Sequence, residues 1–347
     1  MSSMANVLST AKRVQIVAAL IEGMSVRATA RMVDVSKDTV AKLSLELGEA
    51  CIRYMDETLR ELPCKRLQVD VVWGFCCAKQ KNVPPPVQGV SGYGDVWAFT
   101  AVDVETKLIP TFLVGSRDAG CATEFMQDLA SRLVNRVQLT TDDHKMYLSA
   151  VEEGFQGAVD YAMLVKMYGK APEGREVRYS PAECIGCERI GITGQPDPKH
   201  VSTSYVERHN LTLRMDMRRY TRLTNAHNKK LRNHTAALGL FLCFYNFCRL
   251  HQTIRCTSAM AAGVTARVWS IAEMVGLLPA AEHVGGRPRT TTRIVPTTRA
   301  GPRARRRTSP GPAGHAPGRP ACDRAPGSRP AAAPGRPRRR RGPAGRP

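Results

Sequence analysis

Three carboxylates in three different settings are the residues of this chain best suited to chemistry. Asp70 and Asp142 end the runs Leu-Gln-Val-Asp and Leu-Thr-Thr-Asp, whose apolar and β-branched residues predict buried strands. Glu207 lies in Tyr-Val-Glu-Arg-His-Asn, at the start of a basic stretch with helical character. Carboxylate oxygens are ligands that Mg²⁺ and Mn²⁺ prefer and that suit zinc less well. If three separate elements bring these side chains together, we expect a site for two divalent cations that acts on phosphate esters.

Each carboxylate also has a structural interpretation. Ser204-Tyr-Val-Glu207 fits a capping box, in which the glutamate side chain returns to the amide of the first residue. Asp70 fits a charge on a sheet edge, and Asp142 fits a turn former. Both interpretations of Glu207 place it in a first helical turn, so its position alone does not choose between them.

The elements that must position these residues follow from the hydrophobic periodicity. Strands are predicted over residues 67–75, 96–104, 107–115, 136–141 and 159–167, and helices over 122–134 and 146–155. Three strands, a helix, a strand, a helix and a strand is the order of a ribonuclease H-like α/β domain, a mixed sheet with flanking helices. That fold places Asp70 on the central strand and Asp142 just past the neighbouring fourth strand. We assign residues 63–280 to this domain, with residues 168–200, which are rich in Gly, Pro and charge, as an insertion or mobile loop.

The first 62 residues predict an all-α domain with helix-turn-helix spacing. Ser25 is positioned to cap a short helix that runs through Val33, and Ser36 to cap the next helix after a tight connection. In a helix-turn-helix the second helix of the pair enters the major groove with its N-terminal side chains. The residues expected to contact DNA are therefore Ser36, Lys37 and Thr39, with Lys42 near a phosphate. A small helical packing module is the alternative.

Charge is distributed unevenly along the chain. The formal net charge is +21, of which residues 281–347, with 17 Arg and no Lys, carry +15. This segment of Arg, Pro, Gly and Ala has little to bury and is expected to be a disordered tail; translation of GC-rich DNA in a shifted frame would give the same composition. The remaining positive charge gathers between residues 208 and 232, which favours contact with a phosphate backbone over a merely solvated helix face.

Neither a secretory signal peptide nor a membrane span is evident, so we expect a cytoplasmic protein whose eleven cysteines stay reduced. The apolar run at 236–247 is too short to cross a membrane and predicts a buried helix. Cys184 and Cys187 have the spacing of a zinc knuckle, but no second closely spaced pair follows them.

Several motifs resemble those of bacterial insertion-sequence transposases, specifically the InsB-type DDE group, over residues 5 to 278. The motifs are Leu-Gln-Val-Asp70 with Trp73 and Phe75, Gln-Leu-Thr-Thr-Asp142 with His144, Lys145 and Tyr147, Ser-Thr-Ser-Tyr-Val-Glu207-Arg208, Met-Asp-Met-Arg218-Arg219, Leu-Thr-Asn-Ala226, and Tyr-Asn-Phe-Cys-Arg249 with His251.

The resemblance implies an enzyme that cleaves DNA at the ends of a mobile element and transfers the 3′-hydroxyls into target DNA. Asp70, Asp142 and Glu207 would hold two Mg²⁺ or Mn²⁺ ions. Candidates for phosphate contact are His144, Lys145, Arg208, Arg214, Arg218 and Arg219, and His144 fits a turn residue equally well. The implied partners are element ends and target DNA, with a homodimer or higher oligomer on DNA, in the bacterial cytoplasm at the nucleoid.

The chain departs from the family pattern near the predicted site, and the departure at Asp143 leaves alternatives open. Val71 stands where many relatives have a second acid, and Asp143 stands where they tend to have Gly, which relaxes a turn. The alternatives are a catalytically inactive DNA-binding remnant and a ribonuclease H-like nuclease without strand transfer.

Overall fold

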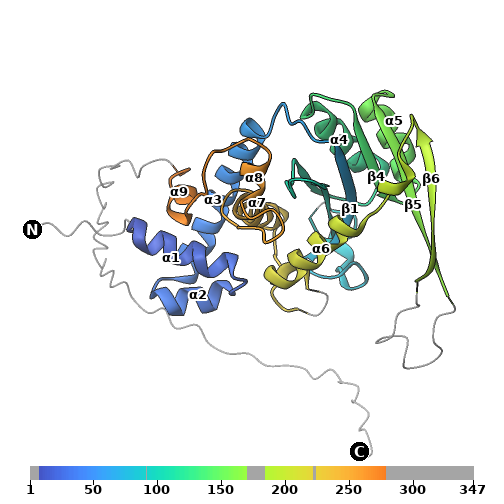
Figure 1. The fold of residues 1–347 in the computed structure, drawn as a ribbon. Coiled ribbons are helices and arrows are strands. Elements are labelled where there is room, and N and C mark those ends of the chain that lie inside the picture. Colours follow the sequence, from blue (N-terminus) through green and yellow to red (C-terminus); the bar gives the residue numbers. More distant parts are fainter. Residues whose placement is uncertain (1–7, 91, 170–183, 222–223, 279–347) are drawn as a thin grey trace, which may run out of the picture. The chain divides into compact units, whose positions relative to one another are not determined.

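The computed structural model describes residues 8–90, 92–169, 184–221 and 224–278. Within these residues a six-stranded mixed sheet has the order β3-β2-β1-β4-β5-β6 (Figure 1). The strands are β1 (Arg66–Cys76), β2 (Gly94–Asp103), β3 (Phe112–Gly115), β4 (Val137–Asp142), β5 (Val159–Tyr168) and β6 (Cys184–Thr193). The first three strands pair antiparallel, β1, β4 and β5 run parallel, and β6 returns antiparallel to β5. The mixed sheet with flanking helices fits the expected ribonuclease H-like α/β fold.

Helices cover both faces of the sheet. The longer helices that flank it are α4 (Ala119–Ser131), α5 (Met146–Phe155), α6 (Ser204–Asp216) and α7 (Leu231–Phe247). Gln68 of β1 contacts α6, whereas Phe99, which lies opposite Val71 in the β1–β2 pair, contacts Phe125 of α4. Because side chains alternate along a strand, positions 68 and 71 point to opposite faces. Helices α4 and α6 therefore pack on opposite sides of β1.

Three helices precede the sheet, and the second and third begin where the sequence predicts. They are α1 (Thr10–Ile21), α2 (Val26–Val33) and α3 (Lys37–Thr58). Both predicted caps form: the Ser25 hydroxyl accepts from the Ala28 amide at 3.1 Å, and the Ser36 hydroxyl accepts from the Thr39 amide at 3.0 Å. Asp34 ends α2 in the left-handed conformation, which permits the tight connection.

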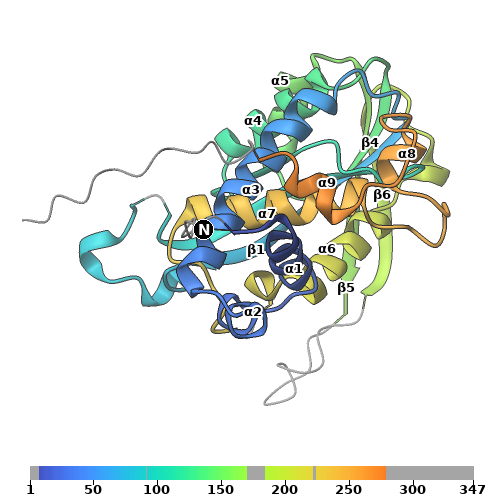
Figure 2. The same cartoon turned by 90° about the vertical axis from the view of Figure 1, so that its left-hand side faces the viewer.

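Helix α3 packs on α7, so these first helices and the sheet share one continuous apolar core (Figure 2). Two small helices, α8 (Ser258–Ala261) and α9 (Ile271–Val275), complete this side. The boundary at residue 62 between a DNA-binding and a catalytic domain stays a prediction.

The predicted strand over 107–115 is wrong in its first half. Lys107 has a left-handed backbone, with φ at 64°, and Pro110 has no amide hydrogen to donate to a neighbouring strand. The amide of Ile109 instead donates to Asn246 Oδ1 on α7 at 3.0 Å. Strand β3 consequently begins at Phe112.

Part of the predicted insertion or mobile loop over 168–200 is the edge strand β6. Most residues of β6 are exposed and lack the alternation of apolar and polar residues on which strand prediction depends. Pairing with β5 makes it a strand, and that is a tertiary contact. Residues 170–183 of the same stretch, and the basic tail over 281–347, lie outside the described residues.

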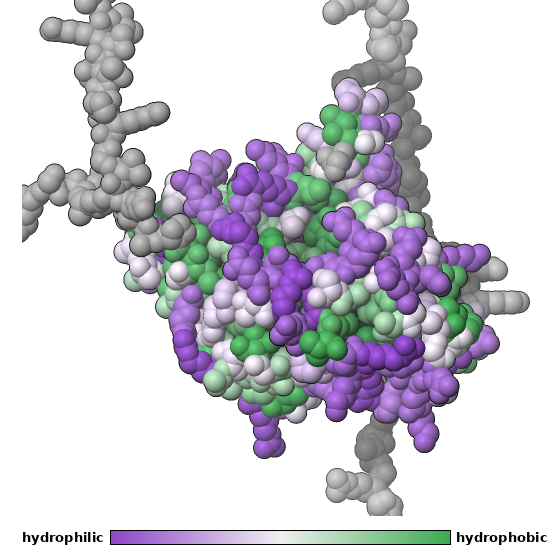
Figure 3. Space-filling view, turned by 90° about the horizontal axis from the view of Figure 1, so that it is seen from above, coloured by the Kyte–Doolittle hydropathy of each residue, from purple (hydrophilic) through white to green (hydrophobic). Residues whose placement is uncertain are grey.

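No helix in the described part of the chain is long and apolar enough to cross a membrane. On the face of the molecule seen in Figure 3, hydrophilic and hydrophobic residues are interspersed.

Candidate active site

Strand register brings Asp70 and Asp142 side by side. The parallel pairing of β1 with β4 joins Arg66 to Gln138 and continues to Gln68 with Thr140. The same offset places Asp142 beside Asp70, two residues beyond the last paired positions. Both carboxylates thus lie where two adjacent strands separate, at the carboxyl end of β4.

Helix α6 is tied to β1 by two side chains that face it. Gln68 Oε1 accepts hydrogen bonds from the amides of Tyr205, at 2.8 Å, and Val206, at 3.1 Å, and so satisfies two donors of the first turn. One turn later, Asn210 Nδ2 donates to Asp70 Oδ2 at 2.7 Å. Gln68 and Asp70 are two residues apart on the strand, and their partners Val206 and Asn210 are one turn apart on the helix. Together these contacts fix how α6 lies against β1. Glu207 is therefore held in the first turn next to Asp70.

The capping-box interpretation of Glu207 is wrong. The N-cap of α6 is Thr203, and Ser204 is already helical. The Glu207 carboxylate accepts from the Thr203 hydroxyl at 2.6 Å and forms an ion pair with Lys166 of β5. The ion pair directs the side chain toward the sheet, although much of the glutamate remains exposed.

The negative charges of Asp142 and Glu207 both act on Asp70. Burial, chiefly, and then the negative charges of Asp142 and Glu207 raise the pKa of Asp70 to about 6, although hydrogen bonds from the Val71 amide and Asn210 oppose the shift. Burial also raises the pKa of Asp142, aided by Asp143 and opposed by the His144 amide and by Arg117. The Arg117 guanidinium lies 3.9 Å from Asp142 Oδ2. Such mutual repulsion is what a bound cation relieves.

As the side chains stand, no three His, Cys, Asp or Glu side chains among the described residues are grouped so as to hold a metal ion. Each carboxylate has another partner in this arrangement: Asp70 accepts from Asn210, Asp142 lies beside Arg117, and Glu207 is paired with Lys166. The donors themselves fit Mg²⁺ or Mn²⁺, because all are hard oxygens. Asn210 Oδ1 is buried without a hydrogen-bond partner in the described structure, next to Asp70. A cation bound at this site would displace the Lys166 ammonium from Glu207.

The residues predicted to enter the major groove divide into two kinds. The hydroxyls of Ser36 and Thr39 lie 2.9 Å apart, and Ser36 caps α3, so both side chains serve the helix start. Lys37 and Lys42 are exposed, and Lys42 lies 3.7 Å from Glu46 in a solvated ion pair.

Among the candidates close to the carboxylates, His144 has the role of a turn residue. Its amide donates to Asp142 Oδ1 at 3.3 Å, and its Nδ1 accepts from the Met146 amide at 3.4 Å. Lys145 is exposed at the start of α5, and Arg208 is exposed beside Glu207 on α6. The other three candidates lie further along: Arg214 in the last turn of α6, and Arg218 and Arg219 in the single turn η5 (Arg218–Tyr220).

Sequence reasoning missed Gln68, Asn210, Lys166 and Arg117. A signal existed for Asn210, because it follows Glu207 by three residues and so shares its helix face. Nothing local marks Lys166 or Arg117, which reach the site from β5 and from the segment after β3.

The Cys184-x-x-Cys187 pair lies on the exposed edge strand. The two sulfurs are 3.9 Å apart as free thiols, and no third ligand stands near them in the described residues. The pair therefore offers no zinc site as it stands.

No protein-family model matches this chain, and no curated protein matches it in sequence. Among solved structures, a piggyBac transposase synaptic complex with hairpin DNA aligns at a TM-score of 0.34 and 12% identity, over 80% of this chain and 73% of that one. A pre-cleavage Mos1 transpososome aligns at a TM-score of 0.19 and 10% identity, over 46% of this chain and 61% of that one. Both scores lie below the level at which two chains share a fold, so neither similarity bears on the function proposed below.

Proposed function

We propose that this chain is an insertion-sequence DNA transposase that cleaves element ends and joins their 3′-hydroxyls to target DNA. The observation that carries the proposal is the approach of Asp70, Asp142 and Glu207, from β1, β4 and α6, at the carboxyl end of the central strand β4. The motif resemblance assigns the same three residues to catalysis. Lys145, three residues after Asp142, and Arg208, next to Glu207 in the sequence, are exposed and suit contacts with phosphate oxygens.

The carboxylates would hold two Mg²⁺ or Mn²⁺ ions. When bound, the ions would activate water or a 3′-hydroxyl and stabilise negative charge on the leaving oxygen. Asn210 orients the Asp70 carboxylate by its 2.7 Å hydrogen bond, and Arg117 adds positive charge beside Asp142. Lys166 neutralises Glu207 until a cation replaces it.

The partner would be DNA, held first by the N-terminal helices. Lys37 and Lys42 stand exposed near the start of α3, where a recognition helix presents its side chains. Joining two element ends to one target requires two active sites, so we propose a homodimer or higher oligomer on DNA.

The test is a strand-transfer assay with the full chain. Labelled duplexes that carry the sequences flanking the coding region are incubated with a target plasmid and Mg²⁺ or Mn²⁺, using the wild type and the isosteric variants Asp70→Asn, Asp142→Asn and Glu207→Gln. Glu153→Gln, an exposed change on α5, is the matched control. Joined products in the wild type and the control, with a loss of at least about 10²-fold in each site variant, would support the proposal. Cutting that survives all three substitutions would refute the assignment of these carboxylates.

Two observations keep the inactive remnant as a second candidate: the Lys166 ammonium on Glu207, and the extra charge of Asp143 beside Asp142. The Asp143 backbone does not have a positive φ, so the fold at this turn does not require glycine. A remnant would bind the duplexes without metal-dependent cutting. A ribonuclease H-like nuclease would cut them without forming joined products.

A further inference from the structure

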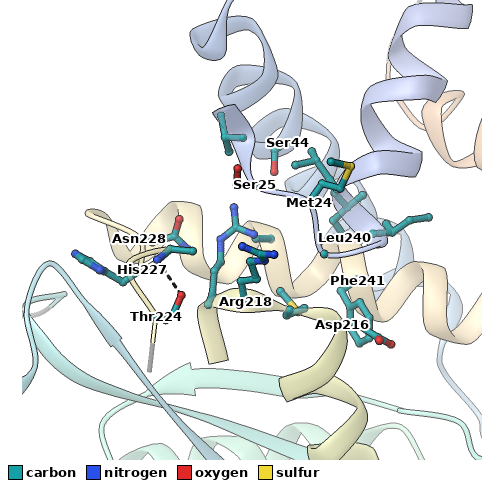
Figure 4. Close-up of a pocket in the computed structure, with 18 of the residues that line it drawn as sticks. Met24, Ser25, Ser44, Asp216, Arg218, Thr224, His227, Asn228, Leu240 and Phe241 are labelled. Carbon is teal, nitrogen blue, oxygen red and sulfur yellow. Dashed lines mark hydrogen bonds between the residues drawn. The ribbon is translucent and has the colours of Figure 1, made fainter. Parts of the chain in front are cut away.

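A polar cavity of about 680 Å³ lies away from the three carboxylates, between the N-terminal helices and the end of α6. Its walls come from the α1–α2 turn, η5, residues 224–228 and α7. In Figure 4, Arg218 lies in the middle of the cavity, with Met24 and Ser25 of the α1–α2 turn on one side and Leu240 and Phe241 of α7 on another. The volume is in the range of small-molecule sites.

In the described part of the chain, the positively charged side chains that line this cavity are not paired with negatively charged ones. Arg27, Arg218 and Arg219 line it, and within the described structure none of their side chains forms an ion pair or a hydrogen bond. Asp216, the carboxylate in the lining, is already paired with Arg249, 2.7 Å away.

Two buried nitrogens without a hydrogen-bond partner point to a missing ligand. Arg219 Nε is buried and unpartnered in the described structure, and so is His227 Nδ1. Burial lowers the pKa of the Arg219 guanidinium, because its charge is removed from water without a neighbouring anion. A buried polar group without a partner costs free energy, and a buried charge costs more. An anion that entered the cavity would remove this cost.

We propose that this cavity binds a phosphate group, either of a DNA strand or of a free nucleotide. A planar guanidinium matches phosphate oxygens in bidentate geometry, and three unpaired arginines at one cavity suit a phosphate better than a carboxylate. Leu240 and Phe241 offer an apolar wall for a sugar or base attached to it. If the source is DNA, the inference rests on the proposed function and adds a second contact to it.

The cavity lies between the N-terminal helices and the end of α6, so a phosphate bound there would contact both. Gly23, with φ at 75°, approaches α6 so closely that a Cβ there would lie 2.7 Å from the Asp216 carbonyl oxygen. The α1–α2 turn therefore touches the end of the helix that carries Glu207. A phosphate held by Arg27 on one side and by Arg218 and Arg219 on the other would join the N-terminal helices to the catalytic helix.

The test compares Arg219→Met with the wild type by thermal unfolding, without divalent cations. The ligands are inorganic pyrophosphate, dAMP and a 20-nucleotide single strand, each at increasing concentration. We expect the wild-type Tm to rise with ligand, since ligands that bind only the folded state stabilise it. Arg219→Met should have an unliganded Tm equal to or above that of the wild type, because the uncompensated charge is gone, and its rise with ligand should be lost.

Arg267→Met is the matched control, because Arg267 is an exposed arginine that pairs with Glu273 outside the cavity. It should respond to every ligand as the wild type does. A response to the single strand alone identifies DNA as the source, and a response to dAMP or pyrophosphate as well identifies free phosphates. No rise in the wild type, or equal rises in Arg219→Met, would overturn the proposal. Neither result depends on cleavage, so failure here is distinguishable from failure of the proposed transposase chemistry.

Discussion

At Asp70, burial and two neighbouring carboxylates make the charged form costly, since its pKa rises from the ordinary 3.8 to about 6. A carboxyl whose folded pKa is raised favours folding at low pH, and that contribution is lost as pH rises from about 4 through 6. Asp70→Asn removes the charge. At pH 7.5 we expect the variant to be more stable than the wild type by up to about 3 kcal/mol, with the difference vanishing near pH 4.

Urea unfolding at several pH values without divalent cations checks this. Asp160→Asn is the opposite control, because a hydrogen bond from Arg136 lowers the pKa of Asp160. That variant should lose stability at neutral pH relative to the wild type. A pH-independent difference for Asp70→Asn would contradict the electrostatic account of the site.

If Glu207 holds a cation as proposed, the Lys166 ammonium paired with it competes with that cation. We expect Lys166→Met to bind Mn²⁺ more tightly, by about tenfold, because the metal no longer displaces an ammonium. Titration of free Mn²⁺ by electron paramagnetic resonance measures this directly, with Lys65→Met, an exposed lysine, as control. Weaker binding in Lys166→Met would show instead that the lysine holds Glu207 in position for the metal.

Among the elements, α6 depends on Gln68 of β1 for the satisfaction of two first-turn amides. Gln68→Leu keeps the size of the side chain and removes the acceptor, so the buried amide of Val206 and the partly buried amide of Tyr205 lose their partner. We expect a loss of about 1–3 kcal/mol in the free energy of unfolding and a larger fractional loss of cleavage, because α6 carries Glu207. Cleavage equal to that of the wild type at a temperature where both are folded would contradict this role.

The crossing of α3 and α7 depends on glycine. A Cβ at Gly48 would lie 2.0 Å from the carbonyl oxygen of Ala236, and one at Gly239 would lie 2.3 Å from Ile52. Gly48→Ala should therefore destabilise the protein by about 3 kcal/mol or more in urea unfolding. Gly120→Ala, in the open first turn of α4, is the matched control and should be neutral or slightly stabilising.

For the molecule as a whole, the proposed function predicts that residues 281–347 contribute to DNA affinity but not to cleavage. Truncation after Leu278 removes 17 Arg but none of the residues of the candidate site. We expect DNA cleavage to remain nearly intact, while the slope of log affinity against log salt becomes shallower, because fewer cations meet phosphates. Binding isotherms at several salt concentrations and the cleavage assay check both parts. A collapse of cleavage would show that the tail is part of the catalytic protein.

The elements that the sequence predicts correctly are those with a strong local hydrophobic pattern or a local cap. The sequence placed β1, β2, β4, α5 and β5 within about two residues. The strands are mostly buried on both faces and so are largely apolar, and α5 has one apolar face. The caps at Ser25 and Ser36 depend only on residues within one turn. The predictions were wrong where a residue distant in the sequence determines the local structure. The edge strand β6 exists through β5, and the segment at Lys107 and Ile109 is drawn toward Asn246 on α7.

The sequence by itself determined the types and the order of Asp70, Asp142 and Glu207 and the strands or helices that carry them. Only the tertiary structure decided that Asn210 holds Asp70, that Lys166 neutralises Glu207, and that Arg218 and Arg219 line a cavity with Arg27. The physical reason is that charge pairing and burial depend on distances in space. Residues 140 positions apart, such as Asp70 and Asn210, come into contact only when the helix packs on the sheet.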